Sequence, residues 1–217
     1  AIMVFLVAFK FVAESLEETP TLESTEVILE MSYIHPDDPG TRVSGEIVLE
    51  LYESDAPKHV ENFLYLVDNG MYDTTIFHRV IDGFMIQGGD IEGKNGAGGY
   101  SGIWYGYCNG EVANADGQIY TSENCQQKDW TVPDEANNGL VHEPAVLAMA
   151  KTSNPNTAGS QFYIVPSDSK PSHLDGLHTV FGAVVSGMDH IDAISEVLTG
   201  NADKPVEDVR LIQAYRS

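Results

Sequence analysis

Residues 77–90 constrain the fold more than any other part of this 217-residue chain. They form two short runs of strand-forming residues, and Asp82-Gly83 between the runs is a dipeptide that favours a tight hairpin turn. Two polar residues, Arg79 and Gln87, lie among the apolar residues of these runs. A guanidinium is always charged and is costly to bury unless its donors are hydrogen-bonded. The hairpin therefore predicts a surface on which Arg79 meets a hydrogen-bonding partner.

Period-two patterns elsewhere in the chain indicate short strands. Within residues 25–33, Val27, Leu29 and Met31 alternate with more polar residues, and residues 45–52 repeat this pattern. Further strands are expected at residues 145–150, 161–165, 179–185 and 206–215. So many short strands favour an all-β barrel or sandwich.

Two segments have the spacing of amphipathic helices. The first begins near Pro57, which suits a first turn, and Gly70 suits its end, with Asp55 close enough to cap it. The second is ended by Gly200 and carries an apolar stripe formed by Met188, Ile191, Ile194 and Leu198. A helix with one apolar face is expected to pack against a sheet or barrel.

Three long motifs, found in this order, resemble those of the cyclophilin family of peptidyl-prolyl cis-trans isomerases. They are residues 77–90, residues 147–164 and residues 172–182, and the similarity extends from about Thr25 to Tyr215. The resemblance implies a mainly β domain over residues 25–217, built as a closed eight-stranded antiparallel β-barrel capped by two α-helices. Relative to a minimal cyclophilin, residues 104–130 form an inserted loop.

The resemblance also implies the residues of the site. Arg79 matches the family's catalytic arginine, and Gln87 matches the residue that orients it and contacts the substrate carbonyl. Further catalytic or pocket positions match Phe84, Met85, Tyr163, Leu174 and His178. The implied substrate-binding positions match Gly96, Ala150, Lys151, Thr152, Gln161 and His173.

Rotation about an X-Pro bond requires no nucleophile, metal or redox centre, so no cofactor is expected. The barrier is about 18–20 kcal/mol because the planar amide loses its resonance. As the amide twists, its nitrogen gains a lone pair, and a fixed cation can bond that nitrogen only in the twisted state. We therefore expect an isomerase that acts on proline-containing peptides and unfolded chains. The alternative is a prolyl-peptide-binding chaperone module with little turnover, and the intact Arg79 and Gln87 favour the enzyme.

Three departures from the family pattern affect these expectations. Tyr163 stands where many members carry Phe, which adds a hydroxyl. His173 stands where many members carry a Trp that contacts cyclosporin, so weak cyclosporin binding is expected. Residues 151–153 replace a shorter segment, and this affects the backbone contacts implied for residues 150–152.

The charge of the chain limits its partners. Acidic residues outnumber basic ones by 33 to 11, and the formal net charge is −22. Such a surface repels phosphate backbones, so nucleic acid is not an expected partner. A saline or extracellular setting, where salt screens the self-repulsion, is one hypothesis; an acidic protein of ordinary surroundings is the other.

The N-terminal residues 1–24 combine an apolar run with an acidic linker. Residues 1–13 are apolar except for Lys10, and they are fewer than the roughly 20 residues that a spanning helix needs. We expect the remnant of a signal peptide or a membrane anchor, with the domain secreted or tethered outside the cytoplasm. An extra strand or helix packed on the domain is the alternative. A monomer is expected.

Cys108 and Cys125 are the only cysteines of the chain. Two thiols cannot form a tetrahedral zinc site without other ligands, and no metal site is expected. In an oxidising compartment a disulfide is expected, and closing a loop of this length would stabilise the fold by roughly 3 kcal/mol. Otherwise the two cysteines are unpaired thiols.

Overall fold

The computed structural model describes residues 25–217, so the apolar segment and acidic linker predicted for residues 1–24 lie outside the described residues. A single antiparallel sheet runs through this domain in the order β3-β9-β1-β2-β8-β6-β7-β5-β4. Its strands are β1 (Thr25–Ile34), β2 (Arg42–Leu51), β3 (Ile76–Phe77), β4 (Arg79–Ile81), β5 (Met85–Gly88), β6 (Val146–Met149), β7 (Phe162–Ile164), β8 (Val180–Ser186) and β9 (Val209–Arg216).

The sheet curls into a nearly closed barrel because its two edge strands are neighbours in the chain. β3 pairs with β9 at one edge and β4 pairs with β5 at the other, and only His78 separates β3 from β4. This also explains why the domain has nine strands where eight were expected: His78 divides one strand into two. The predicted mainly β barrel with two helices is confirmed.

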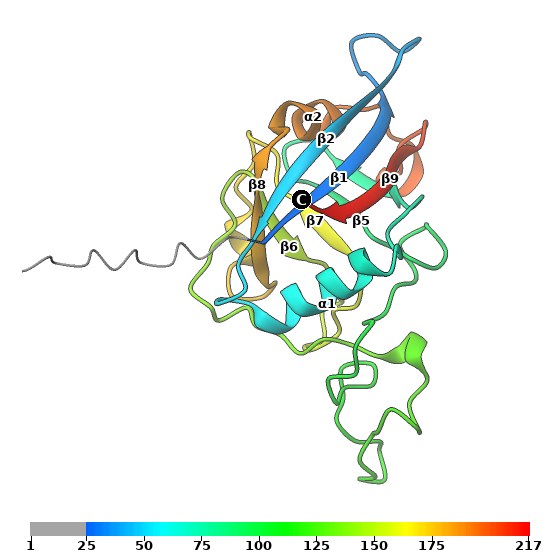
Figure 1. The fold of residues 1–217 in the computed structure, drawn as a ribbon, viewed down its shortest axis with the longest axis vertical. Helices are drawn as coiled ribbons and strands as arrows, with labels where there is room; N and C mark the ends of the chain where they lie inside the picture. Colours follow the sequence, from blue (N-terminus) through cyan, green and yellow to red (C-terminus); the bar gives the residue numbers. More distant parts are fainter. Residues whose placement is uncertain (1–24) are drawn as a thin grey trace, which may run out of the picture.

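The two α-helices cover opposite ends of the barrel (Figure 1). They are α1 (Pro57–Asp68) and α2 (Met188–Ser195). α1 begins at Pro57 as predicted, but the expected cap by Asp55 is wrong. The carboxylate of Glu135 instead accepts hydrogen bonds from the backbone N–H groups of Lys58 and His59, both at 3.1 Å. The first turn of α1 is therefore tied to the loop that follows the insertion.

The second helix is shorter than its sequence pattern indicated. Ile191 and Ile194 are fully buried, but Leu198 lies beyond the helix and its side chain is 76% exposed. Three short 3-10 turns complete the described elements: Gln127–Asp129, Ser172–Leu174 and Asn201–Asp203.

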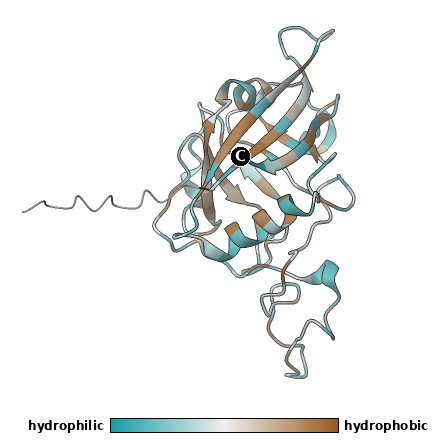
Figure 2. Ribbon diagram, viewed as in Figure 1, coloured by the Kyte–Doolittle hydropathy of each residue, from teal (hydrophilic) through white to brown (hydrophobic). Residues whose placement is uncertain are grey.

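Alternate residues of the strands belong to two separate apolar clusters. Val80, Ile86, Leu147 and Ile164 point into the barrel and belong to its main core. Their neighbours along the chain point outward, and six buried ones form a second cluster, here called the outer cluster: Met85, Val146, Ala148, Tyr163, Val165 and Val180. Figure 2 shows both hydrophobic and hydrophilic residues along the strands at the front of the barrel. The barrel wall is therefore apolar on both faces where the outer cluster lies.

The insertion predicted at residues 104–130 projects from the barrel beyond α1, as the green segment at the bottom of Figure 1. Cys108 and Cys125 form a disulfide with a Cα–Cα distance of 6.0 Å, which confirms the pairing expected for an oxidising compartment. At the base of the insertion the rings of Trp104 and Trp130 lie 5.4 Å apart. The Trp130 indole N–H also donates to the carbonyl of Cys125 at 3.1 Å. These contacts give the insertion a fixed base.

Candidate active site

A row of aligned residues crosses the outer face of the barrel. Arg79 on β4 pairs with Gln87 on β5, Gln87 pairs with Tyr163 on β7, and Tyr163 pairs with Ala148 on β6. Residues that are directly opposite in antiparallel strands have side chains on the same face of the sheet. The register therefore brings Arg79 and Gln87 to the face that carries Tyr163 and the rest of the outer cluster.

The outer cluster gathers the apolar residues that the sequence assigned to the site. Met85 and Tyr163 are buried in it, and Phe84, Leu174 and Ala150 pack against it while partly exposed. The cluster thus has a buried floor and a rim that is open to solvent. A small apolar ring such as that of proline matches this surface.

Arg79 lies at the edge of this face with one ionic partner. Its Nε donates to Asp203 Oδ2 at 3.3 Å, and the two side chains are 40% and 47% exposed. Asp203 belongs to the turn Asn201–Asp203, which lies outside the barrel. Within residues 25–217 the two terminal Nη groups of Arg79 have no hydrogen-bond acceptor. The guanidinium is therefore held by one edge, and its other donors are available to a substrate.

Gln87 and Gln161 connect the row to the glycine-rich loop. Gln87 Nε2 donates to Gln161 Oε1 at 2.8 Å, and Gln161 Nε2 donates to the carbonyls of Gly96 and Gly98 at 3.0 and 2.6 Å. Gly96 has a φ of 87°, and a Cβ there would lie 2.7 Å from the ring of His78. Glycine is therefore required at position 96 both by conformation and by space.

Asp90 holds the same loop from within. It is fully buried and accepts hydrogen bonds from the backbone N–H groups of residues 92, 93, 95 and 96, at 2.9–3.1 Å. Burial alone would raise the pKa of Asp90, but these four donors lower it below its ordinary value. The loop is thus organised around a buried carboxylate.

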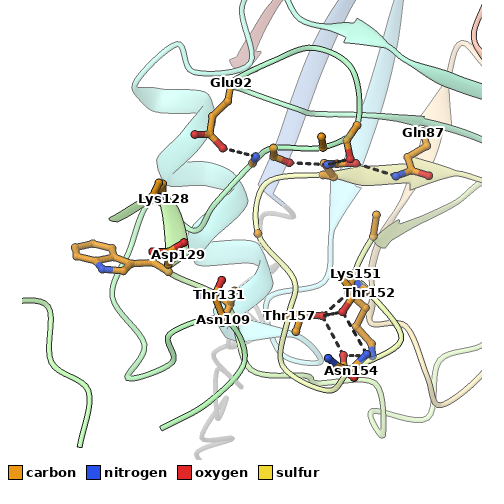
Figure 3. A pocket seen from close by; sticks show the side chains of 18 residues that line it. Gln87, Glu92, Asn109, Lys128, Asp129, Thr131, Lys151, Thr152, Asn154 and Thr157 are labelled. Carbon is orange, nitrogen blue, oxygen red and sulfur yellow. Dashed lines mark hydrogen bonds between the residues drawn. The ribbon is translucent and has the colours of Figure 1, made fainter. Parts of the chain in front are cut away.

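A polar groove with a volume of about 520 Å³ lies beside the row. Figure 3 shows Lys128 and Asp129 of the insertion on one side of it and Thr152, Asn154 and Thr157 on the opposite side. Other lining residues include several predicted to bind substrate: Gln87, Gly96, Ala150, Lys151 and Gln161. The insertion therefore forms one wall of a groove that reaches the proposed catalytic row.

The polar ends of Lys151 and Thr152 are used in contacts within the protein, and Lys151 Nζ lies 3.6 Å from Oδ2 of Asp134. Lys151 Nζ donates to the carbonyl of Asn154 at 3.2 Å, and the hydroxyls of Thr152 and Thr157 are 2.8 Å apart. Ala150 donates its backbone N–H to the carbonyl of Gln161. What this segment offers to the groove is mainly backbone and the aliphatic part of its side chains.

Two histidines border the outer cluster. His178 Nδ1 lies 3.0 Å from the carbonyl of Met149, and its ring meets that of Tyr163 edge to face at 5.8 Å. Burial lowers the pKa of His178, so it is neutral at pH 7 and its Nδ1–H donates to the carbonyl. His173 is exposed and stacks on Phe84 with ring centroids 5.7 Å apart. His173 therefore extends the rim of the cluster.

Three residues that the sequence did not place in the site contact it. Asp203 contacts Arg79 across 124 positions of the chain, and no local pattern signals that contact. The Tyr163 hydroxyl lies 2.7 Å from Nε2 of His142, and Asp175 lies 2.8 Å from Nδ1 of the same ring. The one available signal was Tyr163 itself, since a tyrosine in a buried position usually requires a partner for its hydroxyl.

The outer cluster can accept the proline ring of a peptide, and the polar groove beside it can hold the peptide chain. The partly free guanidinium at the edge of the cluster can then stabilise the twisted amide. These features, on the outer wall of an antiparallel barrel with a helix at each end, define a peptidyl-prolyl cis-trans isomerase.

Comparison with known proteins identifies the family. The family described as "Cyclophilin type peptidyl-prolyl cis-trans isomerase/CLD" matches residues 39–216. This chain therefore belongs to the cyclophilin family, as its motifs predicted. The match supports the enzyme and not the binding module with little turnover.

Several curated relatives carry the name of the same enzyme. "Peptidyl-prolyl cis-trans isomerase-like 1" of Gibberella zeae is 39% identical over 170 residues, which cover 78% of this chain and 88% of the relative. The protein of the same name from Homo sapiens is 40% identical over 173 residues, covering 80% and 87%. "Peptidyl-prolyl cis-trans isomerase CYP18-1" of Arabidopsis thaliana is 40% identical over 167 residues, covering 77% and 87%.

The fold has a solved counterpart. The crystal structure of a Cryptosporidium parvum cyclophilin type peptidyl-prolyl cis-trans isomerase superposes with a TM-score of 0.66 at 26% sequence identity. The superposition covers 89% of this chain and 98% of that structure.

Proposed function

We propose that this cyclophilin isomerises X-Pro bonds in unfolded or flexible protein chains, with Arg79 as the group that stabilises the twisted amide. The register that aligns Arg79, Gln87 and Tyr163 on one face is the observation that carries the proposal. The proline ring rests on the outer cluster, and the chain on one side of the proline extends along the polar groove.

The geometry favours the transition state over the ground state. A planar amide nitrogen has no lone pair to offer, so a donor at the edge of the cluster gains a bond only as the amide twists. Arg79 is fixed through Nε and retains free Nη donors, which means that little reorganisation is needed at that moment. Gln87 is held in place by Gln161 and leaves its carbonyl for the substrate or the guanidinium.

Exchange NMR on a proline-containing tetrapeptide tests this role. We expect Arg79→Ala to lower kcat/KM by about 100-fold, as for the loss of one preorganised donor, with the thermal midpoint little changed. Arg216→Ala is the matched control, because Arg216 forms an ion pair with Asp68 in which the two side chains are 46% and 45% exposed. That variant should keep its activity within about twofold, since exposed ion pairs contribute little. Full activity of Arg79→Ala would remove the mechanism.

We propose a location outside the cytoplasm for the domain, either secreted or tethered through residues 1–13. The disulfide between Cys108 and Cys125 supports this, because such bonds persist mainly in oxidising compartments. Within residues 25–217, no helix has the length and apolar character to cross a membrane. Thiol labelling of the protein taken from its native compartment tests the proposal: two reactive thiols would contradict it.

We also propose that the protein acts as a monomer and does not bind nucleic acid. The net charge of −22 supports both, since like charges repel a second copy and a phosphate backbone alike. Light scattering and a nucleic-acid gel shift at low salt provide the tests.

A further inference from the structure

We infer that His142 is a positioning residue of the isomerase: together with Asp175 it fixes the Tyr163 ring in the floor of the outer cluster, and it thereby sets the affinity for the prolyl peptide. The inference rests on the proposed function and deepens it. His142 lies on the loop before β6 and is 1% exposed, so it cannot touch a substrate.

Three contacts connect these residues, and the one between His142 and Tyr163 is buried. Nε2 of His142 is 2.7 Å from the hydroxyl of Tyr163, and Nδ1 is 2.8 Å from Oδ1 of Asp175. The backbone N–H of His142 donates to the same Asp175 oxygen at 2.8 Å. The rings of His142 and Tyr163 are nearly parallel, with centroids 5.9 Å apart and an interplanar angle of 11°. These contacts therefore fix both the position of His142 and the orientation of the Tyr163 ring.

The direction of each hydrogen bond follows from charge. The backbone N–H and the ring of His142 hold the pKa of Asp175 below its ordinary value, so Asp175 is a carboxylate that can only accept. The proton of neutral His142 is consequently on Nδ1, and Nε2 accepts from the hydroxyl of Tyr163. Burial lowers the pKa of His142 below its ordinary 6.5, although Asp175 opposes this shift. The neutral form is thus the form present at pH 7.

The arrangement matters to catalysis because Tyr163 lies between Gln87 and Ala148 in the row and is part of the surface that receives proline. A ring held by its hydroxyl needs no reordering when the substrate binds. When His142 becomes protonated, Nε2 turns into a donor and the Tyr163 oxygen must accept from it, so the hydroxyl hydrogen turns toward the apolar cluster, where the described residues offer it no acceptor, and the ring is held less firmly. Substrate affinity is then expected to fall.

Other charged and titratable groups lie around His142, and the test must distinguish their effect on KM from that of His142. Asp175 and Tyr163 contact it directly, and His173 on the neighbouring 3-10 turn disfavours its protonation. His178 also feels the charge of His142, and Lys170 acts on Asp175. Among these, His178 is the other buried imidazole beside the outer cluster, so it needs its own variant.

The test measures kcat and KM of the full chain on a proline-containing tetrapeptide from pH 5 to pH 8. For the unmodified protein KM should rise as the pH falls below 6.5. His142→Leu should raise KM about fivefold at pH 7.5, the loss expected for one hydrogen bond to a buried partner, with kcat within about twofold. His142→Gln can accept from Tyr163 and donate to Asp175 without titrating, so it should restore KM and remove its rise in acid.

Two further variants keep the inference open to refutation. His190→Leu is the matched control, because His190 lies on α2 and hydrogen-bonds Tyr33 on β1 at 3.0 Å, and neither residue belongs to the row, so its KM should be unchanged. If His142→Leu does not fold, Tyr163→Phe removes only the hydroxyl and should raise KM about threefold while removing the acid dependence. In His178→Gln the rise in acid should persist.

The outcomes separate the inference from the proposed function. A wild-type protein without isomerase activity would refute the proposed function alone, and the His142 tautomer could still be read from its ring nitrogen shifts. An active wild-type protein whose KM is unaltered in His142→Leu would overturn the inference. An acid dependence that persists in His142→Gln and disappears in His178→Gln would overturn it as well.

Discussion

At the scale of residues, the contact between Arg79 and Asp203 decides how the catalytic cation is presented. Both side chains are nearly half exposed, so the pair contributes only about 0–1 kcal/mol to stability. The turn that carries Asp203 is strained, because Ala202 and Asp203 have φ values of 58° and 57°. A left-handed non-glycine residue costs on the order of 1 kcal/mol, and such strain is often kept at functional sites. The turn thus presents a carboxylate to Nε and leaves the Nη groups free.

Asp203→Ala should lower kcat about three- to tenfold with little change in KM, because the guanidinium loses the contact that orients it. Asp203→Asn should retain most of the activity, since an amide oxygen still accepts from Nε and asparagine tolerates a positive φ. Steady-state assays of both variants provide the measurement. If Asn behaves like Ala, the carboxylate acts through its charge and not through orientation.

Local motifs allowed several site residues to be predicted from the sequence. Arg79 and Gln87 lie in one motif that resembles the family's signature, so matching that motif was enough to assign them to the site, and one hairpin brings them opposite each other. Glu135 at the start of α1 and Asp203 beside Arg79 could not be found in this way. Each meets its partner across more than 70 positions, and only the closed barrel brings them together.

At the scale of elements, the strands and α1 followed the sequence pattern closely, since a barrel wall with one face in the core imposes strict alternation. The insertion is different. It has few regular elements within residues 104–130, and its only helical turn there is Gln127–Asp129. The resemblance implied an inserted loop, but its place as a wall of the groove depends on the fold, which sets it opposite the loop at residues 151–157.

The disulfide should matter to this wall more than to the barrel. Replacing both Cys108 and Cys125 by Ser removes the closure of a loop with a separation of 17 residues, which chain-entropy arguments value at roughly 3 kcal/mol. Because the insertion is local, we expect it to loosen while the barrel stays folded. KM for a peptide long enough to fill the groove should rise about threefold, as ordering of the wall is then required on binding.

Ile119→Ser is the matched control for the double serine variant. Ile119 lies in the same insertion but is 63% exposed and does not line the groove, so KM should be unaltered. A double serine variant with an unchanged KM would show that the wall does not need the disulfide.

At the scale of the whole molecule, the dominant property is the net charge of −22, which comes from 33 acidic residues against 11 basic ones along the chain. Self-repulsion among exposed carboxylates destabilises a compact state, and salt screens it over a Debye length of about 10 Å at 0.1 M. The carboxylates of Asp90 and Glu135 stabilise the fold and are buried or half-buried. Salt therefore screens their interactions much less.

The thermal midpoint is therefore expected to rise by several degrees between about 0.05 M and 1 M sodium chloride, where the Debye length falls to about 3 Å. Potassium chloride should give the same curve, because the effect is screening and not a specific ion site. The measurement is differential scanning calorimetry at pH 7, where the surface carboxylates are ionised. A midpoint that does not change with salt would mean that the acidic surface is spaced widely enough to carry no net repulsion, and would argue against a saline setting as the reason for this composition.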